Sequence, residues 1–513
     1  MWKYKKRLCA AAMTIALSFG VAAGAAVPTS AEEMTFEQMK QAAYDVLPET
    51  NSLEGWPQGP QVYAKSAIVM DMKSGAILYG KKIDEQHYPA SITKLMTALV
   101  ALENSKMDDE VLFSEDSVSF LEPGDASIGM TPGEILNMND ALHGMLLASA
   151  NEVSYAIAES VGKKMGGGFD TFIQKMNDRS KELGCTGSHW TNANGLHDEQ
   201  HYTTAHDMAL IGAAMYQFEE SRAIMQTLNY TIGTTNLVNE TRTFQQNHKM
   251  LWPGHQNYYE YCTGGKTGYT DQAKTTLVTM ADNSDMQLVA VVLEDVGDVY
   301  VDTRSMYDYA YGNFSKVPIA EGLKPAGVKK YQNTDAYIVL PTGADQTAVK
   351  KEIAITDKTK AAGVVTYTYN GQLVGKLPVE LTAKYVEEET GYKIKPVENK
   401  TEKKPDKKEE KTGLSLVAKI FIGLGAAILI FFAGLYGVLK YRQIQIRKRR
   451  ALARKRRQME MRRRQREAAQ RRNDSYREDR RKYPSQNYDQ REYRVRERRS
   501  NEYGSRDRNG RYR

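Results

Sequence analysis

Ser91-Ile92-Thr93-Lys94 follows Pro89-Ala90 and opens an apolar run, Leu95-Met96-Thr97-Ala98-Leu99-Val100. The spacing predicts that Ser91 starts a helix with Lys94 on the same face, because positions i and i+3 are neighbours. Free backbone N–H groups and the positive end of the helix dipole would favour an oxyanion there. Burial or a neighbouring cation would lower the pKa of Lys94 enough for it to act as a base. We therefore interpret Ser91 as a nucleophile and Lys94 as its base.

A serine three residues before a lysine is a weak signal alone, since about two such pairs are expected by chance in a chain of this length. The second pair is Ser160-Val161-Gly162-Lys163, late in a helical run and just before Gly166-Gly167-Gly168. No backbone N–H would point at a serine in that position. We interpret Ser160 as an ordinary helix residue.

Two further motifs follow Ser91 in order. Ser149-Ala150-Asn151 comes where an apolar helix should end, and Lys266-Thr267-Gly268 comes inside a glycine-rich stretch. Similar tripeptides at Ser485-Gln486-Asn487 and Lys411-Thr412-Gly413 fall in a basic tail and a charged segment. Only one combination therefore places all three motifs in order on suitable structure.

The ordered set resembles the S-x-x-K, S-x-N and K-T-G motifs of penicillin-binding proteins and serine β-lactamases. Residues 89–97 and 192–209 are similar to D-alanyl-D-alanine carboxypeptidases, the low-molecular-mass penicillin-binding proteins of serine peptidase family S11. The resemblance covers about residues 60–310. It implies an α/β (α+β) transpeptidase-like fold, in which an antiparallel sheet carries a helical insert and a small all-β domain follows.

The resemblance also implies catalytic roles. Ser91 would form an acyl-ester, Lys94 would take its proton, and Ser149 would relay protons near the leaving group. The implied activity removes the C-terminal D-alanine from peptidoglycan stem peptides, with β-lactam antibiotics such as penicillin as inhibitors. Two alternatives stay open: a β-lactamase, and a non-catalytic wall-binding scaffold. Alanine at position 150, where many β-lactamases have aspartate, favours the carboxypeptidase.

Substrate-binding residues follow from the same resemblance. Asn151 would bind the substrate amide, and Lys266 with Thr267 would bind the terminal carboxylate, for which a cation on an edge strand is suited. Gly268 would leave room for the peptide, and the backbone N–H of Tyr269 would complete the oxyanion hole with that of Ser91. No cofactor is implied.

The order of elements predicts how the catalytic part is built. Strand-like runs near 64–79 precede a helix-rich stretch at about 91–181, and strands return near 274–293 before a last helix near 303–311. A sheet closed by both chain ends, with helices inserted, is expected. The predicted segments are a polar leader at 32–60, a D,D-peptidase domain at 61–315, a small β-rich domain at 316–388 and a charged linker at 389–413.

Asn370-Gly371, between two alternating runs of the β-rich segment, is a strong hairpin signal.

A pair of histidines and a pair of cysteines are the other candidate features. His197 and His201 stand four residues apart, but the preceding Asn194-Gly195 favours a polar loop over a metal site, and no metal is expected. Cys185 and Cys262 could form a disulfide or remain buried thiols.

Both chain ends carry targeting features. Basic residues and an apolar run predict a signal peptide at 1–31, cleaved after Ala31 or near Ala25, although a permanent anchor stays possible. Residues 414–439 predict one transmembrane helix. The basic residues after it place the C-terminus in the cytoplasm. The expected protein is therefore a single-pass cell-membrane protein with an extracytoplasmic catalytic domain.

The charge of the chain is divided unevenly. The net charge is +7, but residues 440–513 hold 29 Lys/Arg and 10 Asp/Glu, a balance of +19, which leaves −12 for the rest. A basic tail next to a membrane, expected to be disordered, favours attraction to anionic lipid over binding of nucleic acid. The sequence leaves the oligomeric state open.

Overall fold

The structure is a computed structural model that describes residues 34–394. The predicted signal peptide at 1–31, most of the linker at 389–413, the transmembrane helix at 414–439 and the basic tail at 440–513 lie outside these residues. Within 34–394, no helix is long and apolar enough to cross a membrane.

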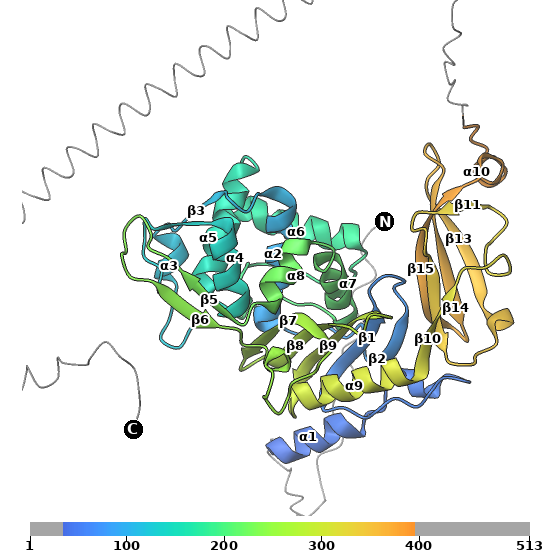
Figure 1. The fold of residues 1–513 in the computed structure, drawn as a ribbon, viewed down its shortest axis with the longest axis horizontal. Helices are drawn as coiled ribbons and strands as arrows, with labels where there is room; N and C mark the ends of the chain where they lie inside the picture. The colour runs from blue at the N-terminus through green and yellow to red at the C-terminus, as the bar shows by residue number, and fades with distance from the viewer. Residues whose placement is uncertain (1–33, 395–513) are drawn as a thin grey trace, which may run out of the picture. The chain divides into compact units, whose positions relative to one another are not determined.

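A five-stranded antiparallel sheet forms the centre of the catalytic part, in the order β2-β1-β9-β8-β7 (Figure 1). Both chain ends contribute strands, as the sequence predicts, and β7 lies at an edge. The strands are β1 (Ala64–Asp71), β2 (Ile77–Lys81), β7 (Cys262–Thr270), β8 (Lys274–Asp282) and β9 (Gln287–Asp295).

Both faces of this sheet are buried because apolar side chains alternate between two cores. On β1, Ile68 and Met70 join the core beneath the helices, while Ala67 and Val69 join the core on the opposite face. Strands buried on both faces read as continuous apolar runs, which is why this segment is recognisable as a strand.

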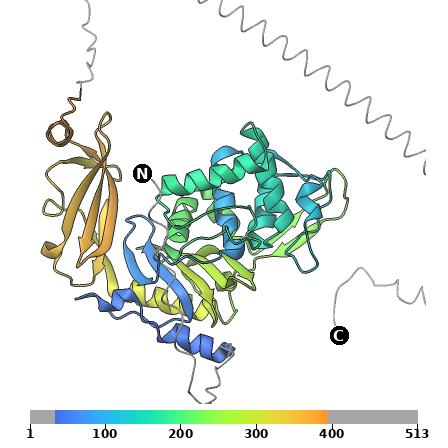
Figure 2. The same cartoon turned by 180° about the vertical axis from the view of Figure 1, so that it is seen from behind.

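Helices cover one face of the sheet, and α9 (Val299–Asn313) covers the other (Figures 1 and 2). The first face carries the helix-rich insert, with α7 packed directly on β1, β8 and β9. Its helices are α2 (Thr93–Asn104), α3 (Asp116–Ser119), α4 (Met138–Leu147), α5 (Asn151–Lys164), α6 (Phe169–Leu183), α7 (Ala205–Met215) and α8 (Glu219–Gln226). Two small hairpins accompany them: β3 (Glu110–Leu112) with β4 (Ile135–Asn137), and β5 (Asn229–Ile232) with β6 (Arg242–Gln245).

The segment predicted as a polar leader is folded. It contains α1 (Phe36–Asp45), which begins with a capping box at Thr35. Trp56 is only 4% exposed, and the buried Lys81 ammonium of β2 donates to the carbonyls of Ala43 and Val62. The sequence of this segment is polar because Lys81 and Trp56 attach it to the sheet. It has no continuous run of apolar residues that would predict a folded element.

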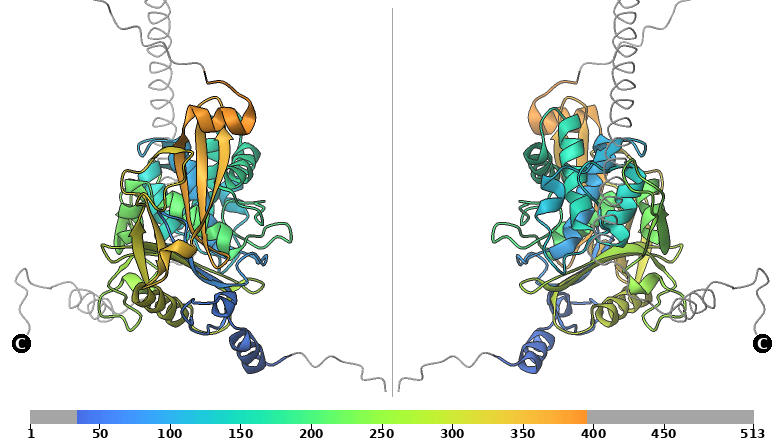
Figure 3. Two further views of the ribbon diagram at one scale, coloured as in Figure 1. Left: turned by 90° about the vertical axis from the view of Figure 1, so that its right-hand side faces the viewer. Right: turned by 90° about the vertical axis from the view of Figure 1, so that its left-hand side faces the viewer.

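Strands also form where the β-rich segment is predicted (Figure 3). They are β10 (Phe314–Pro318) paired with β12 (Tyr337–Pro341), and a sheet of β11 (Val328–Tyr331), β15 (Gln372–Leu381), β14 (Ala362–Tyr369) and β13 (Lys350–Asp357), with α10 (Ala383–Thr390) following. Asn370 and Gly371, with φ of 48° and 88°, join β14 to β15 in the predicted two-residue turn. Lys376 N donates to Ser74 O at 2.7 Å, which ties β15 to the catalytic part.

Candidate active site

Ser91 lies in a single 3₁₀ turn, Ala90–Ile92, that runs directly into α2. The expected helix start is therefore present, one turn ahead of the α-helix. Ala90 adopts a positive φ of 52°, unusual for a residue with a side chain. Gly195 packs against it so closely that an added Cβ would lie 1.9 Å from Ala90 O. The turn that presents Ser91 is thus held from outside its own helix.

Lys94 is fully buried on the first turn of α2. Its Nζ donates to Ser91 Oγ at 2.9 Å, to Asn151 Oδ1 at 2.8 Å and to the carbonyl of Asn194 at 2.6 Å. Burial lowers the pKa of Lys94 well below its usual value, and the Lys266 ammonium lowers it further. This is the condition under which a lysine amine can accept a proton from a serine hydroxyl.

Ser149 and Asn151 come from the junction between α4 and α5. Ser149 has a positive φ of 65°, and Asn151 is the first residue of α5. The sharp turn aims the two side chains at different lysines: Ser149 Oγ accepts from Lys266 Nζ at 3.0 Å, and Asn151 accepts from Lys94. The S-x-N motif therefore connects the two lysines.

Lys266 lies on edge strand β7 and is also buried. Its Nζ donates to Ser149 Oγ and to the carbonyl of Thr267 at 2.8 Å. Desolvation lowers the pKa of Lys266 to about 7. A protonated Lys266 is suited to bind an anionic group, because a carboxylate would compensate for the solvation that its buried ammonium lacks.

The rest of the K-T-G motif brings the strand to the nucleophile. A Cβ added to Gly268 would lie 2.9 Å from Ser91 N, so only glycine lets β7 pass this close. Thr276 Oγ1 of β8 donates to Pro89 O at 2.9 Å and fixes the turn from the sheet side. Thr267 is partly exposed, and Tyr269, at 63% exposure, projects into solvent with its hydroxyl donating to Asp271. Six of the eight predicted site residues thus meet where β7, α2 and the α4–α5 junction converge, while Thr267 and Tyr269 lie on β7 with side chains that form no hydrogen bond with the other six.

Sequence reasoning assigned no role to Asn194, whose backbone carbonyl holds Lys94, or to Gly195. Both belong to the 192–209 segment that carries the family resemblance, which was the only signal for them. His201 of the same segment is buried; its Nε2 lies 2.8 Å from Thr93 Oγ1, and its Nδ1 accepts from Thr191 N. Burial lowers the pKa of His201 to about 3, so the ring is neutral and braces the start of α2.

The polar-loop interpretation of residues 197–201 is supported by the helix that begins just after them. Thr204 Oγ1 accepts from Asp207 N and caps α7. Cys185 and Cys262 do not form a disulfide: both are free thiols, Cys185 buried and Cys262 partly buried.

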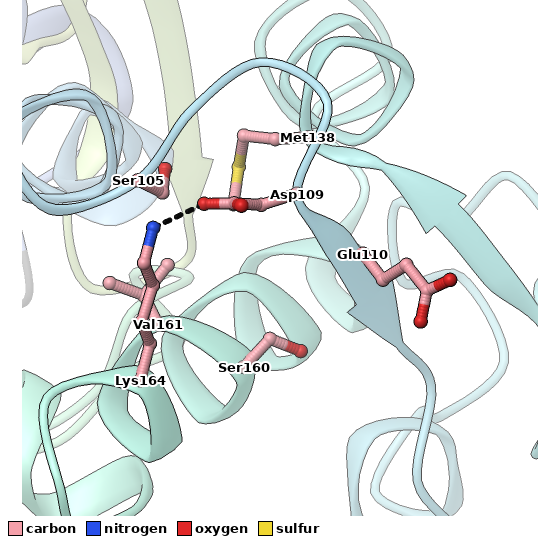
Figure 4. Close-up of a pocket in the computed structure, with 7 residues that line it drawn as sticks. All are labelled: Ser105, Asp109, Glu110, Met138, Ser160, Val161 and Lys164. Carbon is pink, nitrogen blue, oxygen red and sulfur yellow. Dashed lines mark hydrogen bonds and ion pairs between the residues drawn. The ribbon is translucent and has the colours of Figure 1, made fainter. Parts of the chain in front are cut away.

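The second S-x-x-K pair has no comparable geometry. Ser160 Oγ accepts from Leu112 N at 3.2 Å, and Lys163 forms its ion pair with Glu159 rather than approaching Ser160. Ser160 borders a small pocket of about 150 Å³ in which Lys164 pairs with Asp109 (Figure 4). The pocket is lined by Ser105, Asp109, Glu110, Met138, Ser160, Val161 and Lys164. Ser160 is an ordinary helix residue, as interpreted from the sequence.

Known proteins resemble this chain over the same region. Residues 54–297 match the family model described as D-alanyl-D-alanine carboxypeptidase, peptidase S11. The chain is 30% identical over 345 residues to the D-alanyl-D-alanine carboxypeptidase DacF of Bacillus subtilis, a match that spans 62% of this chain and 84% of that protein. It is 28% identical to the DacA carboxypeptidase of Haemophilus influenzae, over 63% of this chain and 83% of that one.

Among solved structures, a D-alanyl-D-alanine carboxypeptidase of Mycobacterium tuberculosis matches at 27% identity with a TM-score of 0.45, covering 52% of this chain and 96% of that one. The family assignment rests on the sequence relatives, of which the DacF carboxypeptidase is 30% identical and is covered over 84% of its length. The chain belongs to the D-alanyl-D-alanine carboxypeptidase family.

Proposed function

We propose that this protein removes the C-terminal D-alanine from peptidoglycan stem peptides through an acyl-enzyme on Ser91. The observation that carries the proposal is the hydrogen bond between Lys94 Nζ and Ser91 Oγ inside a buried site. Neutral Lys94 takes the hydroxyl proton as Ser91 Oγ attacks the carbonyl carbon of the terminal peptide bond. The backbone N–H groups of Ser91 and Tyr269 stabilise the oxyanion.

Collapse of the tetrahedral intermediate breaks the C–N bond and releases D-alanine. Ser149 delivers the proton that the leaving amine needs, and Lys94 is its source. Water then attacks the Ser91 ester while Lys94 takes a proton from it, and Lys94 returns that proton to Ser91 Oγ as the ester C–O bond breaks. The hydrogen bond from Lys94 to Ser91 supports the role of Lys94 as base. Ser149 Oγ accepts from Lys266, so its own hydroxyl proton is not used in that bond and can be donated to the leaving amine.

Substrate binding uses the other side of the site. Lys266, with the Thr267 hydroxyl, binds the terminal carboxylate, which suits an ammonium buried on an edge strand. Asn151 Oδ1 is engaged by Lys94, which leaves the Nδ2 amide to donate to a substrate carbonyl. The close packing of Gly268 against the turn of Ser91 keeps edge strand β7 beside the nucleophile, where a peptide bound along β7 would reach Ser91.

The test uses the purified full-length chain, a labelled penicillin and a peptide that ends in D-Ala-D-Ala. We expect a stable covalent label on Ser91 together with release of D-alanine. The Ser91→Ala variant should lose both, and Ser160→Ala, the matched serine of the second S-x-x-K pair, should keep both. Rapid penicillin turnover would indicate a β-lactamase instead, and neither label nor release would indicate a wall-binding scaffold.

We also propose the placement of this enzyme in the cell. A signal peptide at 1–31, a single transmembrane helix at 414–439 and a cytoplasmic basic tail at 440–513 that attracts anionic lipid are supported by the sequence pattern alone. The catalytic part would then face the cell wall, with residues 316–388 as a β-rich domain between it and the linker. N-terminal sequencing of the mature protein and protease access to the tail in sealed vesicles of each orientation test this topology.

A further inference from the structure

Glu152, immediately after the S-x-N motif, is a completely buried glutamate on the first turn of α5. It forms no ion pair with any residue between 34 and 394. Its Oε1 accepts from Ser127 Oγ and from Ile128 N, both at 2.8 Å. Its Oε2 is buried without a hydrogen-bond partner in the same range. Burying a carboxylate oxygen without a hydrogen-bond partner costs free energy. Helix formation alone therefore does not explain a glutamate at this position.

The neighbouring residue makes a matching contact. Asn151 N donates to Ala126 O at 2.8 Å, so Asn151 and Glu152 together fasten residues 126–128 to the start of α5. Gly129 N donates to Ser127 Oγ at 2.9 Å and closes the loop on itself. The loop is therefore attached to the same helical turn that presents the Asn151 side chain to Lys94.

We propose that Glu152 is a positioning residue for the reaction. It clamps residues 126–128 onto α5 and thereby fixes the Asn151 side chain that receives the Lys94 amine, while its carboxylate acts on the charge of Lys94. The role deepens the proposed function and rests on it, because it requires Lys94 to be the base.

Charge supports the second part of this role. The groups that act on Lys94 come from three elements: Lys266 of β7 lowers its pKa, whereas Glu152 of α5 and Asp125 of the loop raise it. Glu152 therefore opposes the dominant effect of burial, and sets how high the pH must be before Lys94 is neutral. Removing its charge should lower the pKa of Lys94 further.

Three variants distinguish the attachment of residues 126–128 to α5 from the effect of the Glu152 charge on Lys94. Glu152→Ala removes both, and we expect acylation by a fluorescent penicillin to slow about tenfold or more as Asn151 loses its support. Glu152→Gln keeps an acceptor for Ser127 and Ile128 and should restore most of the rate. It should still move the acidic limb of the pH–rate profile down by about one pH unit. Glu159→Gln, on the same helix but outside the groups acting on Lys94, should change neither quantity.

An unmoved acidic limb in Glu152→Gln would overturn the electrostatic role, and this readout holds even where Glu152→Ala fails to fold. A Glu152→Ala enzyme that acylates within about twofold of the wild type would overturn the clamp. Acylation and D-alanine release by the unchanged full-length chain test the proposed function separately. A normal wild type with unresponsive Glu152 variants therefore contradicts only the positioning role.

Discussion

Lys266 carries the charge that the proposed reaction uses to bind a carboxylate, yet burial lowers its pKa to about 7. The free enzyme would thus lose this charge as the pH rises above about 7. We expect KM for a peptide ending in D-Ala-D-Ala to rise by up to about tenfold per pH unit there, because only the ammonium form binds the carboxylate. Initial rates across pH 6–9 measure this. A peptide amide, which lacks the carboxylate, should show no such rise, and equal behaviour of both peptides would refute the assignment.

Gly195 packs against the turn that presents Ser91, so its lack of a side chain matters for the position of the nucleophile. It has a φ of 86°, and an added Cβ would meet the Ala90 carbonyl that precedes the nucleophile. Gly195→Ala should displace Ser91 and slow penicillin acylation by about a hundredfold.

The control for this substitution is Gly166→Ala. Gly166 has a similar φ of 94° but open space around it, so only backbone strain is added. We expect a loss of about 1 kcal/mol in the free energy of unfolding with normal acylation. Equal acylation defects in the two variants would mean that strain, and not the contact with Ala90, is responsible.

At the scale of elements, strand β2 holds the N-terminal segment through one buried lysine. Lys81 Nζ donates to Ala43 O and Val62 O at 2.7 and 2.8 Å, and burial lowers its pKa to about 8. Lys81→Met leaves both carbonyls without their donor, which we expect to cost about 1–3 kcal/mol. Limited proteolysis should then cut within residues 34–62 much faster. Lys82→Met, at the adjacent and partly exposed position, should leave the cleavage rate unchanged. Faster cleavage in this variant too would show that Lys81 does not hold the segment specifically.

Whole-molecule stability depends on a carboxyl pair beneath the central sheet. Asp295 of β9 is buried next to Asp302 of α9, whose Oδ2 accepts from Tyr63 N at 2.6 Å. Burial, followed by the charge of Asp302, raises the pKa of Asp295 far above its usual value. Asp295 Oδ2 has no hydrogen-bond partner within residues 34–394, and a proton on it would allow it to donate to the neighbouring Asp302 carboxylate.

The sign of the pH effect follows from this raised pKa. Above about pH 4 the unfolded chain releases the Asp295 proton while the folded protein keeps it. Stability therefore falls as the pH rises toward the folded pKa, by at most about 1.4 kcal/mol per pH unit for one proton. Asp295→Asn should flatten this decline in urea unfolding at pH 5, 6.5 and 8. Asp335→Asn, at an exposed position, should not, and an unchanged slope in Asp295→Asn would show that the proton is not held there.

Local pattern was sufficient for several strands, for one hairpin and for the ordered motifs. Continuous apolar runs identified β1, β8 and β9, Asn370-Gly371 identified its hairpin, and the i, i+3 spacing placed Lys94 beside Ser91. These features depend on residues close in the chain, so periodicity and turn chemistry are enough to predict them. The predictions for the signal peptide, transmembrane helix and basic tail concern residues outside 34–394 and stay predictions.

Packing between distant segments decided the remaining features. The carbonyl of Asn194 is 100 residues from the Lys94 that it holds, and Lys266 is 117 residues from Ser149. The role of a backbone carbonyl cannot be predicted from the residue type. The N-terminal segment has a polar sequence because Lys81 attaches it, so its folding could not be predicted from apolar residues either. The order of the motifs could therefore be predicted from the sequence, because it depends only on residue identity and spacing. Burial of the two lysines, and with it the chemistry of Ser91, arises only when the folded segments exclude water from them.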